Sequence, residues 1–257
     1  MLDDFRLRVD DAVHHHPVVV ANDYTRWFAT GAATPEDVRR LTVQFSVFSH
    51  LFIEAQLRKV INAPNLEAYR AGKEILMNEL GVVFNGRVDE DGVATDGSIE
   101  GSRFRFSAAH FEWLVRFATP LGLTFGDLGK RRHGSPTTLH FCDELLRIYG
   151  SEDPSEAEGA SYAVENWAAA GFWKELIAGL QAFTDREQLS LPLAFWTWHD
   201  RVEDQHAAHT AEELVQAYET PGFDEERFLR AGVEMLDAVK VFWDGLEQDR
   251  LEHRSAA

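Results

Sequence analysis

Three histidines and three acids lie within twelve consecutive positions, in the stretch WHDRVEDQHAAH (residues 198–209). On a helix, His199, Glu203 and His206 project from one face, because offsets of four and seven positions return to the same side. Imidazole nitrogens and carboxylate oxygens are typical ligands of divalent metal ions. The spacing therefore indicates either part of a metal site or the solvated face of an amphipathic helix that is rich in histidine.

Other acids and one histidine fall among apolar residues when helical periodicity is applied. Glu165 lies in SYAVENWAAAGFW, Glu79 in KEILMNELG, Glu54 in FSHLFIEAQL and His110 in SAAHFEWLVRF. Singly, such a histidine is usually a hydrogen-bonded core residue and such a glutamate is usually partly solvated. Together, several inward charges from separate helices would be costly without cations. We therefore predict a site for two divalent ions, with candidate ligands Glu54, Glu79, His110, Glu165, His199, Glu203 and His206.

The ligand types narrow the choice of metal. Nitrogen and oxygen donors without thiolates suit iron or manganese, with zinc as an alternative. Carboxylates that bridge two ions favour activation of O2 at a di-iron centre. Ferritin-like proteins use two Glu-x-x-His motifs for such a centre, whereas this chain has one, Glu203-x-x-His206. The sequence therefore favours a di-iron centre on a different helical scaffold.

Helical signals dominate the chain that must position these residues. Thr34 and Pro35 start a helix predicted over residues 35–62, and a second helix is predicted to stop near Gly81. The glycine-rich, acidic stretch that follows predicts a small hairpin or a mobile loop. We predict one all-α domain over residues 1–257, with about seven helices and a polar loop or hairpin insertion near residues 85–105. The later helices are expected in FSAAHFEWLVRFA, SPTTLHFCDELLRIYG and residues 154–181, 191–219 and 223–252.

Composition limits the partners. The chain has 43 acids against 25 bases and a formal net charge of −18. That charge repels nucleic acid and anionic membrane surfaces, so we expect neither as a partner. Cys142 is the single cysteine, which excludes an internal disulfide and a thiolate cage and fits a reducing compartment. With no leader-like start and no long apolar run, the sequence predicts a soluble cytoplasmic protein with a small-molecule substrate, and it allows a homodimer.

The order and spacing of the candidate ligands resemble the haem-oxygenase-like di-iron oxidases and oxygenases over about residues 35–212. The resemblance implies the haem oxygenase and TenA type of helical scaffold, two iron ions with manganese as an alternative, and O2 as co-substrate. It implies an external electron donor and oxidation of an amino acid, amine or fatty acid, through C–H abstraction with C–C cleavage or desaturation, or through N-oxygenation, in a biosynthetic pathway. The pieces that carry the resemblance are Glu54, Glu79 in MNELG, His110 in AAHFEWLVRFATPLGL, Glu165, and His199-x3-Glu203-x2-His206.

The chain departs from that family pattern in three places. Glu79 and His110 stand 31 positions apart, where the family commonly has about a dozen, which an insertion near residues 85–105 would explain. Many members have aspartate where Glu203 stands. Glu54 is not matched in every member, and His50, one turn earlier, is an alternative donor.

Three rival functions remain open at this stage. A TenA-like hydrolase would use a cysteine nucleophile, for which Cys142 is the candidate, although a small buried hydrophobe is the simpler interpretation. A haem-binding protein would need an axial histidine, for example within His14 to His16. A non-catalytic interaction protein would simply solvate its acids. Bulky residues near the presumed ligand helices are more often core than pocket; they are Trp167, Phe172, Trp173, Phe195 and Trp196.

Overall fold

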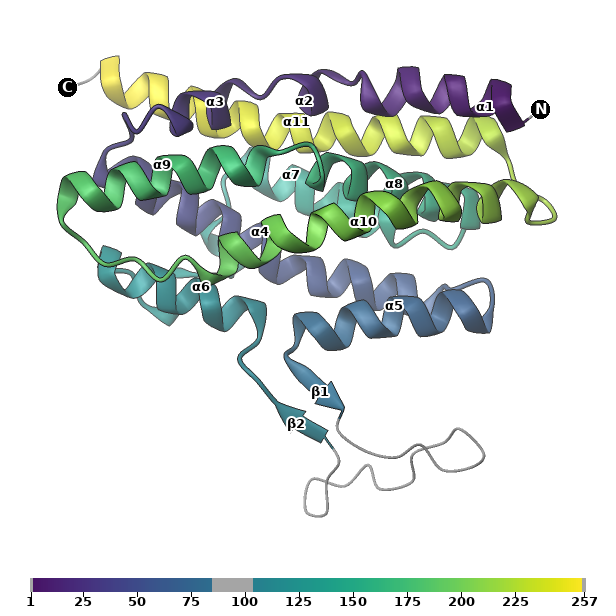
Figure 1. The fold of residues 1–257 in the computed structure, drawn as a ribbon, viewed down its shortest axis with the longest axis horizontal. Helices are drawn as coiled ribbons and strands as arrows, with labels where there is room; N and C mark the ends of the chain where they lie inside the picture. The colour runs from purple at the N-terminus through teal and green to yellow at the C-terminus, as the bar shows by residue number, and fades with distance from the viewer. Residues whose placement is uncertain (1, 85–103, 256–257) are drawn as a thin grey trace.

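The computed structural model describes residues 2–84 and 104–255, and it describes the backbone but not the side chains of residues 83–84, 104–106, 202–213 and 254–255. Long helices run side by side along the longest axis of the molecule, with the two chain ends at opposite ends of one edge (Figure 1). This confirms the predicted all-α class. The long elements are α4 (Pro35–Ile61), α8 (Pro154–Ala168), α9 (Phe172–Glu187), α10 (Ala194–Glu219) and α11 (Glu225–Ser255).

The N-terminal segment is helical and lies against α11 (Figure 1). Phe5 anchors it: this fully buried ring contacts Phe223 and Phe228 edge-on, each at 5.5 Å between centroids. The sequence patterns did not predict these short helices, because none is long enough to show a clear apolar period. They are α1 (Leu2–Val9), a π-helix (Asp10–His14), α2 (Pro17–Val20) and α3 (Asp23–Ala29).

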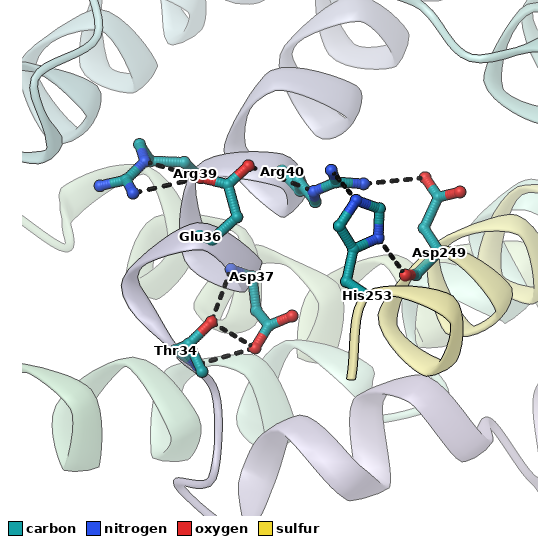
Figure 2. Close-up of polar contacts among 7 residues, drawn as sticks. All are labelled: Thr34, Glu36, Asp37, Arg39, Arg40, Asp249 and His253. Atoms are coloured by element: carbon teal, nitrogen blue, oxygen red, sulfur yellow. Dashed lines mark hydrogen bonds and ion pairs between the residues drawn. The ribbon is translucent and has the colours of Figure 1, made fainter. Parts of the chain in front are cut away.

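Helix α4 begins as predicted, at a capping box between Thr34 and Asp37. The Thr34 hydroxyl accepts from the Asp37 backbone N–H at 3.2 Å, and the Asp37 carboxylate accepts from the Thr34 N–H at 2.8 Å. Figure 2 shows this cap beside Arg40, which reaches the end of α11 through Asp249 at 3.8 Å and also contacts His253. The C-terminal helix is therefore tied to the start of the helix that lines the site.

Helix α5 (Leu66–Glu79) packs against α4 and ends near Gly81, as predicted. Two short antiparallel strands follow, β1 (Val82–Phe84) and β2 (Phe104–Phe106), and they form the stem of the predicted excursion. The rest of the excursion, residues 85–103, lies outside the described residues. The stem leads into α6 (His110–Ala118), three single-turn 3-10 helices, α7 (Pro136–Glu144) and a π-helix (Leu145–Tyr149).

The prediction of a single helix over residues 154–181 is wrong, because α8 and α9 are separate helices. Gly171 separates them with a φ of +91°, a left-handed conformation that ends a helical run at little cost only for glycine. The sequence AAAG before Phe172 has high helix propensity except at that glycine, which is why periodicity alone ran through the break. With the N-terminal helices, this break raises the number of described helices above the seven predicted.

Aromatic side chains fill the centre of the bundle. Phe45 of α4 contacts Trp196 at 5.1 Å, Trp173 at 5.6 Å and Trp243 at 6.3 Å between ring centroids, so α4, α9, α10 and α11 meet at one point. Rings in such edge-on and tilted arrangements stabilise a core beyond the area that they bury. Within the described residues, no helix combines the length and the apolar character needed to cross a membrane.

Candidate metal centre

Glu79, His110 and His199 converge from three helices. One potential ligand atom of each lies within 4.8 Å of the other two, which is close enough for a single ion to bind all three. His110 Nδ1 is 3.0 Å from Glu79 Oε1, and the side chains are only 3% and 14% exposed, respectively. The His110 and His199 rings meet at 5.0 Å between centroids. The structure therefore brings together three of the seven residues that the sequence singled out.

The β1–β2 stem explains how Glu79 and His110 meet despite their separation in sequence. Glu79 is the last residue of α5 and His110 the first of α6, and the strands between them pair Val82 with Phe106. The Ser107 N–H donates to the Gly81 carbonyl at 2.7 Å and closes the base of the stem. Gly81 has a φ of +69°, and a Cβ there would lie 2.5 Å from the Ser107 carbonyl oxygen, so glycine is required.

His199 is oriented by its own helix. Its Nδ1 lies 2.7 Å from the Phe195 carbonyl oxygen, and since a carbonyl can only accept, Nδ1 carries the proton. In that tautomer Nε2 has the lone pair that a metal needs. The Trp173 ring stacks on the His199 ring at 4.8 Å between centroids and fixes its plane.

His110 Nδ1 provides the test of whether these residues fit a metal ion. The atom is buried and has no hydrogen-bond partner among the residues that the structure describes, because the short approach to Glu79 lacks hydrogen-bond geometry. A buried polar atom without a partner is costly and calls for a missing group. At metal–donor distances of about 2.1 Å, two donors at right angles lie about 3 Å apart, which matches the separation of these two atoms. The donor set fits a divalent cation.

A cavity of about 150 Å³ lies beside this cluster, and Glu79 and His199 form part of its wall. Glu165 of α8 lines the same cavity, so a fourth predicted residue faces the same space. Most of the remaining wall is aromatic and comes from α4, α8, α9 and α10. These aromatic residues are Phe45, Phe48, Phe52, Trp167, Trp173, Phe195 and Trp198.

Part of this wall could be found from the sequence and part could not. Trp167, Trp173 and Phe195 belong to the bulky group noted near the ligand helices, whereas Phe172 and Trp196 of that group pack in the core. The wall residues of α4 were missed, although Phe48 and Phe52 are one turn apart on one face. Ser49, Asn78 and Trp198 carried no sequence signal.

The prediction that Glu54 points inward is wrong. Its side chain is exposed and does not line the cavity, whose α4 wall includes Phe48 and Phe52. The Glu54 charge instead contributes to a raised pKa of Arg131, for which the hydrogen bond that Arg131 donates to the Asp143 carboxylate is the main cause. Glu54 lies two turns beyond Val47 on the same side of α4, but Val47 is buried and Glu54 is exposed.

His50, the alternative donor, also lies away from the cavity wall. Its ring packs on Phe111 at 4.1 Å between centroids. Burial, assisted by the charge of Lys130, lowers the pKa of His50 and favours its neutral form. His50 therefore does not join the cluster of Glu79, His110 and His199.

Glu203 and His206 lie where α10 is described as backbone only. The helix is continuous from Ala194 to Glu219, so the offsets of four and seven positions from His199 are preserved along it. Their side chains lie outside the described residues, and their role as ligands stays a prediction.

Cys142 is a poor nucleophile in this fold. Its side chain is 5% exposed on α7, and it does not belong to the described cavity wall. Burial raises the pKa of the thiol to about 12, because the thiolate would lose its hydration. A TenA-like hydrolase that uses this residue is therefore disfavoured.

We expect Cys142 to resist thiol reagents in the native protein. At pH 8 a pKa of about 12 leaves about one thiolate in ten thousand molecules, against about a quarter for an unperturbed thiol. Labelling with a disulfide reagent at pH 8 should be slow when folded and fast in denaturant. Fast stoichiometric labelling of the folded protein would contradict the burial of Cys142.

The N-terminal histidines are engaged in structural contacts. His14 uses both ring nitrogens, with Asp10 at 3.0 Å and Asn166 at 3.0 Å. His16 accepts from the Val18 backbone N–H at 3.3 Å and contacts Asp237 at 3.2 Å. These contacts account for both side chains without a haem.

Comparison with known proteins places the architecture. The protein has the all-α haem-oxygenase-like fold, which confirms the predicted scaffold. A domain of unknown function with that fold from Shewanella denitrificans OS217 superposes with a TM-score of 0.63 and 14% identity, over 99% of this chain and 94% of its own. A TenA homologue from Pseudomonas syringae pv. tomato DC3000 gives 0.67 and 11%, over 96% and 92%.

A CADD-like protein of unknown function from Nostoc punctiforme PCC 73102 gives a TM-score of 0.62 and 18% identity, over 96% of this chain and 97% of its own. No family model and no curated protein matches the sequence. Identities this low establish the fold alone, since one fold hosts many activities. Function has to be argued from the site.

Proposed function

We propose that the protein is a non-haem di-iron oxidase or oxygenase that uses O2 to oxidise a small organic molecule. The observation that carries the proposal is the convergence of Glu79, His110 and His199 at an apolar cavity, with the buried Nδ1 of His110 lacking a hydrogen-bond partner. These three residues would hold one ion. Glu165, together with Glu203 and His206, would hold the second ion.

The chemistry that such a centre would supply when bound is C–H abstraction with C–C cleavage or desaturation, or N-oxygenation, by O2 with electrons from an external donor. The chain itself holds the donors and excludes water. The Phe195 carbonyl keeps His199 in the tautomer whose Nε2 can bind a metal. The aromatic wall limits hydration of the space next to the ligands and orients a substrate there. We propose no nucleic acid or membrane partner and a cytoplasmic location.

The test is anaerobic reconstitution with ferrous iron followed by exposure to O2. We expect two ions bound per chain and a transient visible absorption that appears only with O2. The blank is protein that is free of copper and from which iron has been removed with a chelator, treated in the same way. Binding of no more than one ion, with no absorption change on addition of O2, would overturn the proposal.

A further inference from the structure

The cavity beside Glu79 and His199 limits the size of the molecule that can reach the centre. Its volume is about 150 Å³. A protein cavity of about 150 Å³ lined by apolar residues accommodates one benzene ring. A compact ring therefore fits, and an extended acyl chain would have to leave most of its length outside.

The chemistry of the wall limits the charge of that molecule. Apart from Glu79, Glu165, His199 and the indole N–H groups of the tryptophans, the only polar side chains among the described wall residues are Ser49 and Asn78. None of the described wall residues is a lysine or arginine, and residues 202–213 of the adjoining helix contain neither in their sequence. A free carboxylate would lose its hydration there without gaining a cationic side chain, and Glu79 and Glu165 would repel it.

Two wall residues offer hydrogen-bond donors that no described residue accepts. Trp167 and Trp173 are 2% and 5% exposed, and the Nε1 of each is buried without a hydrogen-bond partner among the described residues. A buried tryptophan N–H normally finds an acceptor. Trp196 also has a buried Nε1 without a partner in the described part of the chain, but it lies outside the described cavity wall and so provides a control.

We propose that the cavity binds a compact, uncharged molecule built on a single ring and carrying a hydrogen-bond acceptor. The role of this molecule as a substrate rests on the proposed di-iron function, but its binding does not. The cavity volume favours a single ring, and the wall disfavours a free carboxylate. The indole N–H groups of Trp167 and Trp173 favour a ligand that carries a hydrogen-bond acceptor.

The test measures binding to the full chain, both metal-free and loaded with Mn²⁺, by tryptophan fluorescence and by the shift in melting temperature. The probes are benzamide, benzoate and decanamide. Benzoate shares the ring of benzamide, and decanamide shares its amide group. We expect saturable binding of benzamide, with benzoate and decanamide at least about tenfold weaker to the metal-free protein. Benzoate or decanamide binding as tightly as benzamide, or no saturable binding of benzamide, would overturn the proposal.

Two alanines at the end of α8 give a matched pair of variants. Ala168 lines the cavity, whereas Ala170 lies just beyond the helix and is exposed. Ala168→Phe should weaken benzamide binding at least about tenfold by filling the cavity, and Ala170→Phe should not change it. If both substitutions weaken benzamide binding equally, benzamide binds outside this cavity. If Ala168→Phe does not fold, the comparison of the three probes on the unmodified chain still decides.

The donor is tested by comparing benzamide with toluene, which has the ring but no acceptor. The preference for benzamide should fall in Trp167→Phe or Trp173→Phe and persist in Trp196→Phe. If both Trp167→Phe and Trp173→Phe still prefer benzamide to toluene, the proposed hydrogen bond from these tryptophans to an acceptor on the ligand is wrong. If the protein binds benzamide but not iron, the cavity assignment stands and the proposed function is rejected. If it binds iron but not benzamide, the proposed function stands and the cavity assignment is rejected.

Discussion

Replacement of His110 by alanine is expected to lower the iron bound after reconstitution from two ions per chain to one or none. The O2-dependent absorption should fall at least about tenfold, since loss of a group at a metal site typically costs that much in affinity or activity. The reason is geometric, because His110 Nδ1 lies 3.0 Å from Glu79 Oε1 and has no hydrogen-bond partner within the described chain. Iron is measured by a chelator assay and the absorption by stopped flow.

His140→Ala is the matched control, because His140 is exposed on α7 and away from the described cavity wall. It should bind the same iron as the unmodified chain. Far-UV circular dichroism and the melting temperature show whether His110→Ala remains folded. Should a folded His110→Ala protein still bind two ions and respond to O2 normally, His110 is a core residue and the assigned cluster is incorrect.

Helical periodicity located His110 and His199 because each belongs to a helix, where spacing along the chain fixes which side chains share a face. His110 opens α6, a short helix whose apolar face is buried, so the inward face could be read directly. The contact between Glu79 and His110 could not be predicted, because it depends on strands β1 and β2, which bring together two residues 31 positions apart. The two strands that connect Glu79 to His110 lie directly before and after the inserted residues in the sequence (Figure 1).

Glu54 shows where periodicity fails. Helix α4 has 27 residues, and the same stripe that is buried at Val47 is exposed at Glu54. In the first half of the helix, the segment around Gly129 packs near α4, with the Gly129 N–H donating to the Ser46 hydroxyl at 3.0 Å. A pattern of apolar residues reports which side of a helix is inward where a neighbour is present, but not how far that neighbour extends.

Replacement of Gly159 by alanine is expected to destabilise the protein, although alanine within a helix normally stabilises it by about 0.5–1 kcal/mol relative to glycine. Gly159 is where α8 meets α11. A Cβ at this position would lie 2.2 Å from the Phe228 carbonyl oxygen and 3.0 Å from its Cα. Both are backbone atoms of α11 and cannot rotate away, so the helices would have to separate. We expect a net loss of about 2–3 kcal/mol in the free energy of unfolding, measured by urea titration.

The same crossing links the core to the candidate centre, because α8 carries Glu165 less than two turns beyond Gly159. Displacing α8 should therefore also lower iron binding at the position that Glu165 would help to hold. Gly126→Ala is the control: the nearest atom to its Cβ, the Thr124 hydroxyl oxygen, is at 3.5 Å, so stability should change by no more than about 0.5 kcal/mol. A Gly159→Ala protein as stable as the parent would mean that α8 and α11 cross farther apart than this, and the backbone contact would no longer explain the glycine.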